Sequence, residues 1–271
     1  MCYIGITGYK NTGRITAAWL LANAIEWKIG NATPEEWDKE YRKLVADVIA
    51  DPDVVESTRH CTIDSFGGYI LGFIKIFVPT LGSLDIEDKQ VQEWWAINPK
   101  TFEVLPVEEV EQEELVGTII WDRLKEGWMK VKDFIIYFAD TVMKGHFGDN
   151  VWLNVAKFST ATTMADGEYQ IFWDVKTDAE FDFIKSNGVM VVLKNLERRQ
   201  KGGYRKFSKI IKSDHKWTLD TTGDLAEHSE KFYRIAEQII NKEYQNYQNE
   251  EEIKLKIQET GQASSDSYIC P

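Results

Sequence analysis

Cysteine is scarce in this chain of 271 residues, which contains only three. Cys2, Cys61 and Cys270 are far apart and include no Cys-x-x-Cys pair. The sequence therefore predicts neither a disulfide framework nor a cysteine-based zinc site. This use of cysteine is typical of a protein from a reducing cytoplasm, which is the localisation that we expect.

The chain also lacks a long uninterrupted apolar run. Its longest apolar stretch, 69–81, contains Lys75 and Pro79 and is too short to cross a bilayer. The first residues show no basic segment followed by an apolar one, so the sequence predicts no secretory signal. We therefore expect a soluble protein without a membrane partner.

Positive charge is in deficit, with 32 Lys and Arg against 44 Asp and Glu and a net charge of −12. This balance argues against a protein that coats nucleic acid by bulk electrostatic attraction. Hydrophobic residues make up 43% of the chain, which is enough for a sizeable core. The length suits one large domain, with or without insertions.

The chain opens with an apolar strand pattern, 3–7, which leads through a glycine-bounded loop into an amphipathic helical pattern, 15–27. A strand, a glycine loop and a helix in this order build the P-loop that cradles phosphates. Gly8 and Gly13 would let the loop backbone approach a phosphate, and the helix N-terminus would supply N–H groups and partial positive charge. The alternative is a tight turn between a strand and a helix that binds no ligand.

Strand and helix patterns alternate along the rest of the chain. The strand patterns are 61–64, 169–175 and 189–193, and the helix patterns are 34–50 (with Thr33 as N-cap), 68–77, 130–144, 151–158, 178–186 and 227–244. Elements of these lengths in alternation predict an α/β fold, in which a parallel sheet is flanked by helices in three layers. The helix 68–77 is apolar enough to predict that it is buried.

Two segments carry a charge that sets them apart within the domain that we predict over 1–245. Segment 84–117 is strongly acidic and predicts an insertion or a mobile subdomain with a solvated face. Segment 195–215 is basic, with seven Lys and Arg and no acid within 198–212. It fits either an exposed loop or a cationic lid over phosphates. The polar residues 246–271 are expected to form a C-terminal tail.

Five short blocks, which together cover most of the chain from residue 3 to about 240, resemble the bacteriophage deoxynucleoside monophosphate kinases. The loop 8–17 resembles the GxKxSGKDTxA loop of that family, and 147–152 resembles its FGxxxW turn. Segment 174–180 is similar to its DVRFxNE segment, 131–139 to its VRELLQ…FGT helix, and 228–230 to a late HxSE motif.

The resemblance implies a P-loop kinase that uses Mg²⁺ and transfers the γ-phosphoryl group of ATP to the 5′-phosphate of a deoxynucleoside monophosphate. It implies that the ATP phosphates are bound by Gly8, Lys10, Thr12, Gly13, Arg14 and Thr16. It implies that the monophosphate, its sugar or its base is contacted by Lys132, Trp152, Asp174, Lys176 and Glu180. Catalytic charge would come from Lys10, Arg14 and Lys132, and a hydroxyl ligand for the metal from Thr16.

The chain departs from the pattern of this family at several polar positions. Arg14 stands in place of the Walker lysine, and Ile15 in place of the acid that follows it. Lys132 and Lys176 replace two arginines, which exchanges a bidentate fork for a point charge. Because these polar groups belong to the phosphate-transfer site of that family, we expect their loss or replacement to affect catalysis.

Three functions therefore stay open at the level of the sequence. The first is a deoxynucleoside monophosphate kinase, and the second is a kinase of a modified nucleotide or of a base in DNA. In the second case nucleic acid would be a partner, contacted through 198–212. The third is a catalytically impaired protein that keeps the fold and binds nucleotides. The preferred base and the formation of a homodimer are also left open.

Overall fold

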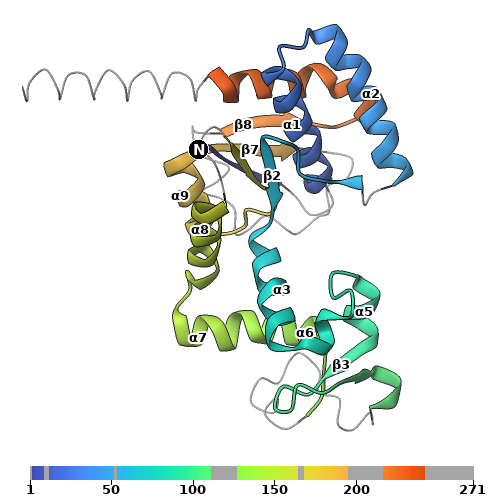
Figure 1. Cartoon of the computed structure of the whole chain (residues 1–271), viewed down its shortest axis with the longest axis vertical. Helices are drawn as coiled ribbons and strands as arrows, with labels where there is room; N and C mark the ends of the chain where they lie inside the picture. Colours follow the sequence, from blue (N-terminus) through green and yellow to red (C-terminus); the bar gives the residue numbers. More distant parts are fainter. Residues whose placement is uncertain are drawn as a thin grey trace, which may run out of the picture. The chain divides into compact units, whose positions relative to one another are not determined.

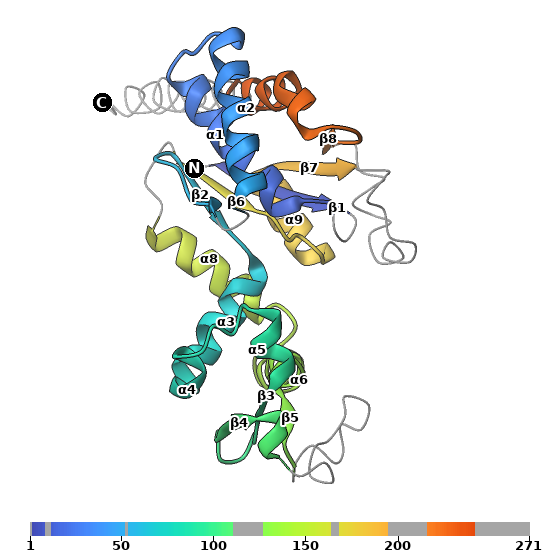
Figure 2. The ribbon, with the colours of Figure 1, turned by 90° about the vertical axis from the view of Figure 1, so that its right-hand side faces the viewer.

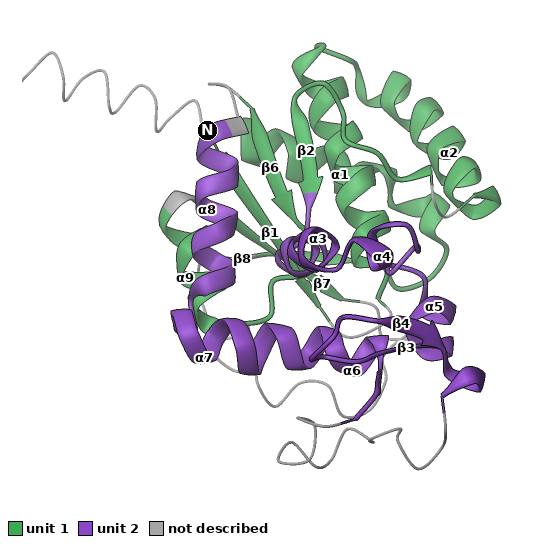
Figure 3. Ribbon diagram, turned by 60° about the horizontal axis from the view of Figure 1, so that its bottom comes forward, with its two compact units in different colours: residues 1–63, 165–271 green, residues 64–164 purple. Residues whose placement is uncertain are grey.

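The computed structural model describes residues 2–8, 12–51, 54–110, 127–163, 168–194 and 216–241. Two compact units make up the chain: unit 1 comprises 1–63 and 165–271, and unit 2 comprises 64–164 (Figure 3). The described part of the acidic segment, 84–110, belongs to unit 2. Outside the described residues lie Lys10, 111–117, the basic segment 195–215 and the tail 246–271. The assignment of 1–245 to one kinase-like domain stays a prediction.

A five-stranded sheet with the strand order β2-β6-β1-β7-β8 forms the centre of unit 1. Its strands are β1 (Cys2–Gly8), β2 (Cys61–Asp64), β6 (Tyr169–Phe172), β7 (Gly188–Lys194) and β8 (Lys216–Asp220). β1 pairs in parallel with both β6 and β7, and β7 pairs in parallel with β8. All seven residues of β1 are buried, as expected of a central strand covered on both faces. The expectation of an α/β fold with a mostly parallel sheet is confirmed.

Helices cover both faces of this sheet. α1 (Arg14–Ile29), α2 (Pro34–Ala50) and the helical residues 229–241 lie over one face, and α9 (Asp178–Asn187) lies over the other (Figures 1 and 2). A short 3₁₀ helix, η4 (Leu225–His228), directly precedes 229–241. The core on the first face joins α1, α2 and 229–241 to the sheet. The helices therefore build two layers around the parallel strands.

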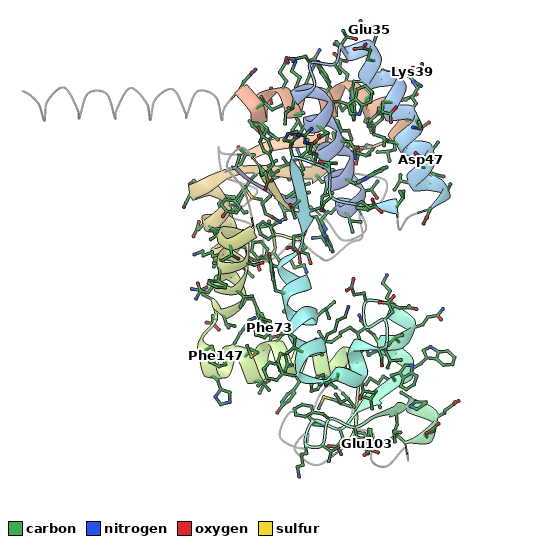
Figure 4. All side chains as sticks on the ribbon, in the orientation of Figure 1. Glu35, Lys39, Asp47, Phe73, Glu103 and Phe147 are labelled. Atoms are coloured by element: carbon green, nitrogen blue, oxygen red, sulfur yellow. The ribbon has the colours of Figure 1, made fainter. Side chains whose placement is uncertain are left out.

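The sequence of α2 explains both its start and its orientation. Thr33 is the N-cap, and its hydroxyl accepts a hydrogen bond from the Glu36 N–H while the Glu36 carboxylate accepts one from the Thr33 N–H. This capping box confirms the predicted helix start. The buried residues recur every three or four positions: Trp37, Tyr41, Leu44, Val45 and Val48. On the opposite side, Glu35, Lys39 and Asp47 project into solvent (Figure 4).

Unit 2 combines short helices with a small antiparallel sheet of strand order β4-β3-β5. Its strands are β3 (Trp95–Ile97), β4 (Val104–Pro106) and β5 (Met129–Lys130). Its helices are α3 (Phe66–Phe77), α4 (Pro79–Gly82), α5 (Lys89–Trp94), the 3₁₀ helix η2 (Val107–Glu109), α6 (Val131–Ile136), the π-helix η3 (Tyr137–Met143), α7 (Lys144–Phe147) and α8 (Val151–Thr163).

Two expectations for unit 2 need correction. The predicted helix 130–144 is helical only from Val131, because Lys130 belongs to β5, and its middle is the wider π-helix η3 instead of regular α-helix. The apolar helix α3 was expected to be buried, yet only Phe66 and Ile74 of it are fully buried. Most of the apolar side chains of α3 are therefore only partly covered by their neighbours or are exposed. No helix among the described residues is both long and apolar enough to span a membrane.

Candidate functional site

The candidate site begins where β1 ends at Gly8. A Cβ atom at this position would lie 2.8 Å from the Leu193 carbonyl oxygen and 3.0 Å from Thr12 Oγ1. Contacts this short leave no space for a side chain, so only glycine lets β1 approach β7 closely and the loop fold back. Thr12 is buried and lies at the other end of the loop. The close packing holds both ends of the loop together.

α1 begins directly after this loop and has no side-chain cap at its N-terminus. Gly13 is the N-cap and adopts the left-handed conformation, with φ 74° and ψ 39°. The Gly13 carbonyl accepts the first helical hydrogen bond, from the Ala17 N–H, at 2.8 Å. The N–H groups at the start of a helix have no acceptor within the helix, and they attract anions together with the helix dipole. This geometry suits a phosphate group.

A small cleft of about 40 Å³ opens beside the start of α1. Its lining comes from both ends of unit 1: Thr12, Gly13, Thr16 and Ala17, together with Thr221, Gly223 and Leu225. At roughly 10–15 Å³ for each water, this volume holds about three waters, which is closer to one phosphate group than to a whole nucleotide. The cleft therefore presents the helix N-terminus and the Thr16 side chain to a small ligand.

The turn after β8 is a part of this cleft that the sequence patterns did not predict. Gly223 has φ 91°, which a residue with a side chain rarely adopts, so the turn depends on glycine. The sequence Thr221-Thr222-Gly223, which follows an alternating strand pattern, weakly indicates this turn. The preceding basic run obscures the start of that strand.

Arg14, Asp174 and Lys176 come together at the same edge of the sheet. Asp174 is only 2% exposed, and its Oδ2 lies 3.3 Å from Lys176 Nζ. Burial lowers the pKa of the Arg14 guanidinium, and the charge of Asp174 raises that pKa again. A guanidinium stays protonated in proteins even so. The chain therefore holds two cations around one buried carboxylate.

Hydrogen bonds join the segment that follows β6 to the end of β1, which explains why these three side chains lie close together. The Val175 N–H donates to the Ile6 carbonyl at 3.3 Å, and the Thr7 hydroxyl donates to the Val175 carbonyl at 2.9 Å. Because the two strands are parallel, their carboxyl ends lie at one edge of the sheet. Ligand sites of open α/β sheets lie at this edge.

Glu180, which the resemblance placed at the substrate, caps α9. Its Oε2 accepts hydrogen bonds from the N–H groups of Lys176, at 2.6 Å, and Thr177, at 2.8 Å. The Thr177 hydroxyl accepts from the Glu180 N–H in return, which completes a capping box. Burial raises the pKa of the Glu180 carboxyl, and these backbone hydrogen bonds lower it in part. Its contacts are those of a helix cap, and a role at the substrate stays a prediction.

Lys132 and Trp152 belong to unit 2, whereas the other described candidate residues belong to unit 1. Trp152 is 6% exposed and donates its indole N–H to the Ala139 carbonyl at 3.3 Å. Its ring lies edge-on to the Phe73 ring, with the two ring centroids 5.6 Å apart. These are the contacts of a core residue, and a core role is the alternative to a role in which Trp152 stacks on a base. Lys132 forms an ion pair with Glu93 at 2.6 Å, which raises the pKa of its ammonium group. Both roles at a substrate stay predictions.

The part of the chain that the structure describes offers few side chains as ligands for a metal ion. That part contains no group of three or more His, Cys, Asp or Glu side chains arranged to hold a metal ion. Thr16 lines the cleft beside α1, together with Thr12 and Thr221, so its hydroxyl belongs to the same small site as the helix N-terminus. Mg²⁺ needs few protein ligands when phosphate oxygens and water complete its shell, so this set fits an ion that arrives with a nucleotide.

No protein-family model matches the chain, and no curated protein matches it significantly in sequence.

Proposed function

We propose that this protein is a P-loop kinase-like phosphotransferase that moves the γ-phosphoryl group of ATP to a deoxynucleoside monophosphate and forms the diphosphate. The observation that carries the proposal is the glycine turn from β1 into α1, with Arg14 as the first helical residue beside Asp174. The resemblance of the loop 8–17 to the phage kinases supports the same function.

The residues at this turn would act by positioning and by charge. Phosphoryl transfer requires little covalent chemistry from the protein, so aligned reactants and neutralised phosphate oxygens supply most of the rate. The N–H groups at the start of α1 would hold phosphate oxygens, and the Arg14 guanidinium would donate to them as a fork. Asp174 would keep the Arg14 side chain in place through its negative charge.

A magnesium ion would be held by the Thr16 hydroxyl together with phosphate oxygens and water. When bound, such an ion neutralises the charge that develops on the transferred group. The Lys176 ammonium group lies at the same edge of the sheet, where it would bind the monophosphate once its ion pair with Asp174 opens. These roles rest on the residues of unit 1 alone.

A second function, nucleotide binding without turnover, is favoured by the start of α1. Ile15 occupies the second helical position and is 42% exposed, so an apolar side chain stands where the family has an acid. Arg14 also shares its charge with a buried carboxylate. Under this proposal ATP binds but no phosphoryl group is transferred. A kinase of a base in DNA would depend on 198–212, which lies outside the described residues.

The test couples ADP release to an optical signal, with ATP, Mg²⁺ and each of the four deoxynucleoside monophosphates, and measures ATP binding by calorimetry. We expect turnover with at least one monophosphate and at least about tenfold lower kcat/KM for Arg14→Ala. The matched control is Arg42→Ala, which removes an exposed arginine that pairs with Asp38 on α2. ATP binding without turnover would support the second function, and absence of both would contradict both.

A further inference from the structure

Unit 2 contains an open cleft that the proposed phosphotransfer does not use. The cleft measures about 1020 Å³ and lies where α5 passes into β3 and where β4 passes into η2. Trp95 pairs with Pro106 across the antiparallel strands, and both residues line the cleft. Trp94, Val107 and Glu108 lie next to the pair and also line the cleft. The small sheet therefore presents a wall of tryptophan, proline and valine.

The apolar wall is open to water. Trp94 is 71% exposed, although tryptophan is among the residues that gain most from burial. An exposed aromatic side chain on the wall of a cleft is a recurrent sign of an interaction surface. Val110 and the partly buried Trp95 continue the apolar wall into the cleft.

The charged groups around the cleft leave an excess of negative charge. Glu93 is neutralised by Lys132 at 2.6 Å and Lys130 at 3.3 Å, and these contacts lower the pKa of its carboxyl. Glu108 is exposed and has no ion pair among the described residues. The surrounding segment, 84–110, together with Lys130 and Lys132, contains seven acidic and four basic residues. The cleft therefore favours a cationic occupant.

We propose that this cleft binds a basic segment of a partner protein. An arginine or lysine of that segment stacks on the face of Trp94 and pairs with Glu108, and a neighbouring apolar side chain packs against Trp95 and Pro106. A cation over a tryptophan face and an ion pair at the rim of an apolar groove are both favourable at such surfaces. The proposal concerns a second function of unit 2 and does not depend on phosphotransfer in unit 1.

Other occupants fit the charges less well. A second copy of this chain would bring the same acidic face to a two-fold contact, where like charges repel. A nucleic acid strand or a free nucleotide carries negative phosphates, and the acidic surroundings of the cleft oppose them. A basic peptide combines the required charge with side chains that fill an apolar wall.

The experiment is a selection from a random peptide display library with the full-length protein as bait, followed by fluorescence titration of the selected peptides. We expect enrichment of peptides that combine Arg or Lys with apolar residues. Their dissociation constants should rise at least about tenfold on Trp94→Ala and on Glu108→Lys, but at most about threefold on Trp94→Phe. Binding should also weaken with added salt, because ion pairs at an exposed rim are screened.

Two matched variants show whether the effect belongs to the cleft. Phe147→Ala removes another exposed aromatic side chain of unit 2, and Asp47→Lys reverses another exposed charge, on α2 of unit 1 (Figure 4). Neither should change the dissociation constants more than about twofold. No enrichment, selected peptides without basic residues, or equal binding by Trp94→Ala would each overturn the proposal.

Discussion

Unit 1 and unit 2 differ in how completely they bury their apolar side chains. In unit 1, strands of four to seven residues are covered by helices on both faces, and the central strand β1 is buried along its whole length. Unit 2 has strands of two or three residues, and it contributes seven of the nine large apolar side chains that are exposed among the described residues. The difference suggests that unit 1 is organised for a fixed site, whereas the surface of unit 2 is suited to contacts with other molecules.

The largest effect should come from adding one methyl group to the sheet of unit 1. At Gly188, which pairs with Tyr3 across β7 and β1, a Cβ would lie 1.8 Å from the Tyr3 carbonyl oxygen. We expect Gly188→Ala to lower the free energy of unfolding by about 5 kcal/mol, because backbone cannot yield as a side chain does. The measurement is denaturant unfolding followed by circular dichroism.

The control in unit 2 is Gly72→Ala on α3, where an added Cβ meets nothing within 4 Å. A glycine inside a helix is less favourable than alanine, so this change should stabilise the protein by about 0.5–1 kcal/mol. Equal effects of the two changes would show that the units tolerate added volume alike and would remove this part of the comparison.

Within unit 2, two tryptophans separate the core from the exposed surface. Trp152→Ala should cost about 3–5 kcal/mol, because it empties space between Phe73 and the Ala139 carbonyl. Trp94→Ala should change the free energy of unfolding by less than about 0.5 kcal/mol, because its ring is exposed. The same unfolding experiment measures both. A large loss for Trp94→Ala would show that this residue supports the fold and would weaken its role as a docking surface.

The start of α1 offers a test of catalysis in unit 1. Combining Arg14→Lys with Ile15→Asp restores the residues that the phage kinases have at these positions, and should raise ADP release at least about tenfold, or about 1.4 kcal/mol in activation free energy. The matched control combines Arg42→Lys with Ile49→Asp, two exposed positions of α2. A double variant that creates turnover absent from the native chain would identify the native loop as a relic of a kinase site.

The smallest effect concerns pH, and it should have opposite signs for one glutamate of each unit. Lys132 and Lys130 lower the pKa of Glu93 in the folded state, so its contribution is present above its unfolded pKa and is lost as pH falls through the folded value. Burial raises the pKa of Glu180, so its charged form costs stability as pH rises from the unfolded value through the folded one.

The measurement compares the native chain with Glu93→Gln and Glu180→Gln between pH 3 and pH 8, by the free energy of unfolding. The advantage of the native chain over Glu93→Gln should shrink toward acid pH, and its advantage over Glu180→Gln should grow there. Equal pH dependence for the two glutamines would contradict the opposite causes given for the two shifts.

Much of unit 1 could be predicted from the sequence because its elements have strong local signals. The apolar run before Gly8 gives β1, Thr33 and Pro34 mark the start of α2, and the pattern at 61–64 gives β2. Parallel strands buried on both faces read as apolar runs, which is why β7 was also found. β8 follows the basic run and alternates weakly, so it was missed.

In unit 2 the helices at 68–77, 130–144 and 151–158 were predicted, but the short strands and the exposure of the apolar residues were not. Strands of two or three residues, such as β5, carry too few positions for a period of two to show. The apolar run of α3 predicts burial, but no periodic pattern reveals how much of a helix its neighbours cover.

The candidate site could be predicted in part. The resemblance at 174–180 places Asp174 and Lys176 near the loop after β1, and hydrogen bonds between the ends of β1 and β6 bring them there. No sequence pattern distinguished a glutamate that caps α9 from one that contacts a ligand, since Glu180 fits both. Trp152 was ambiguous for a similar reason, because core and stacking tryptophans look the same in a sequence.

The division of unit 1 into 1–63 and 165–271 has a consequence for synthesis on the ribosome. β1 emerges before unit 2, but its partners β6 and β7 follow only after all of unit 2 has been made. Unit 2 is continuous in sequence and can fold while β1 still waits, since local contacts form before distant ones. During that interval an apolar strand is exposed, and nascent chains should depend on chaperones most strongly until β7 has emerged.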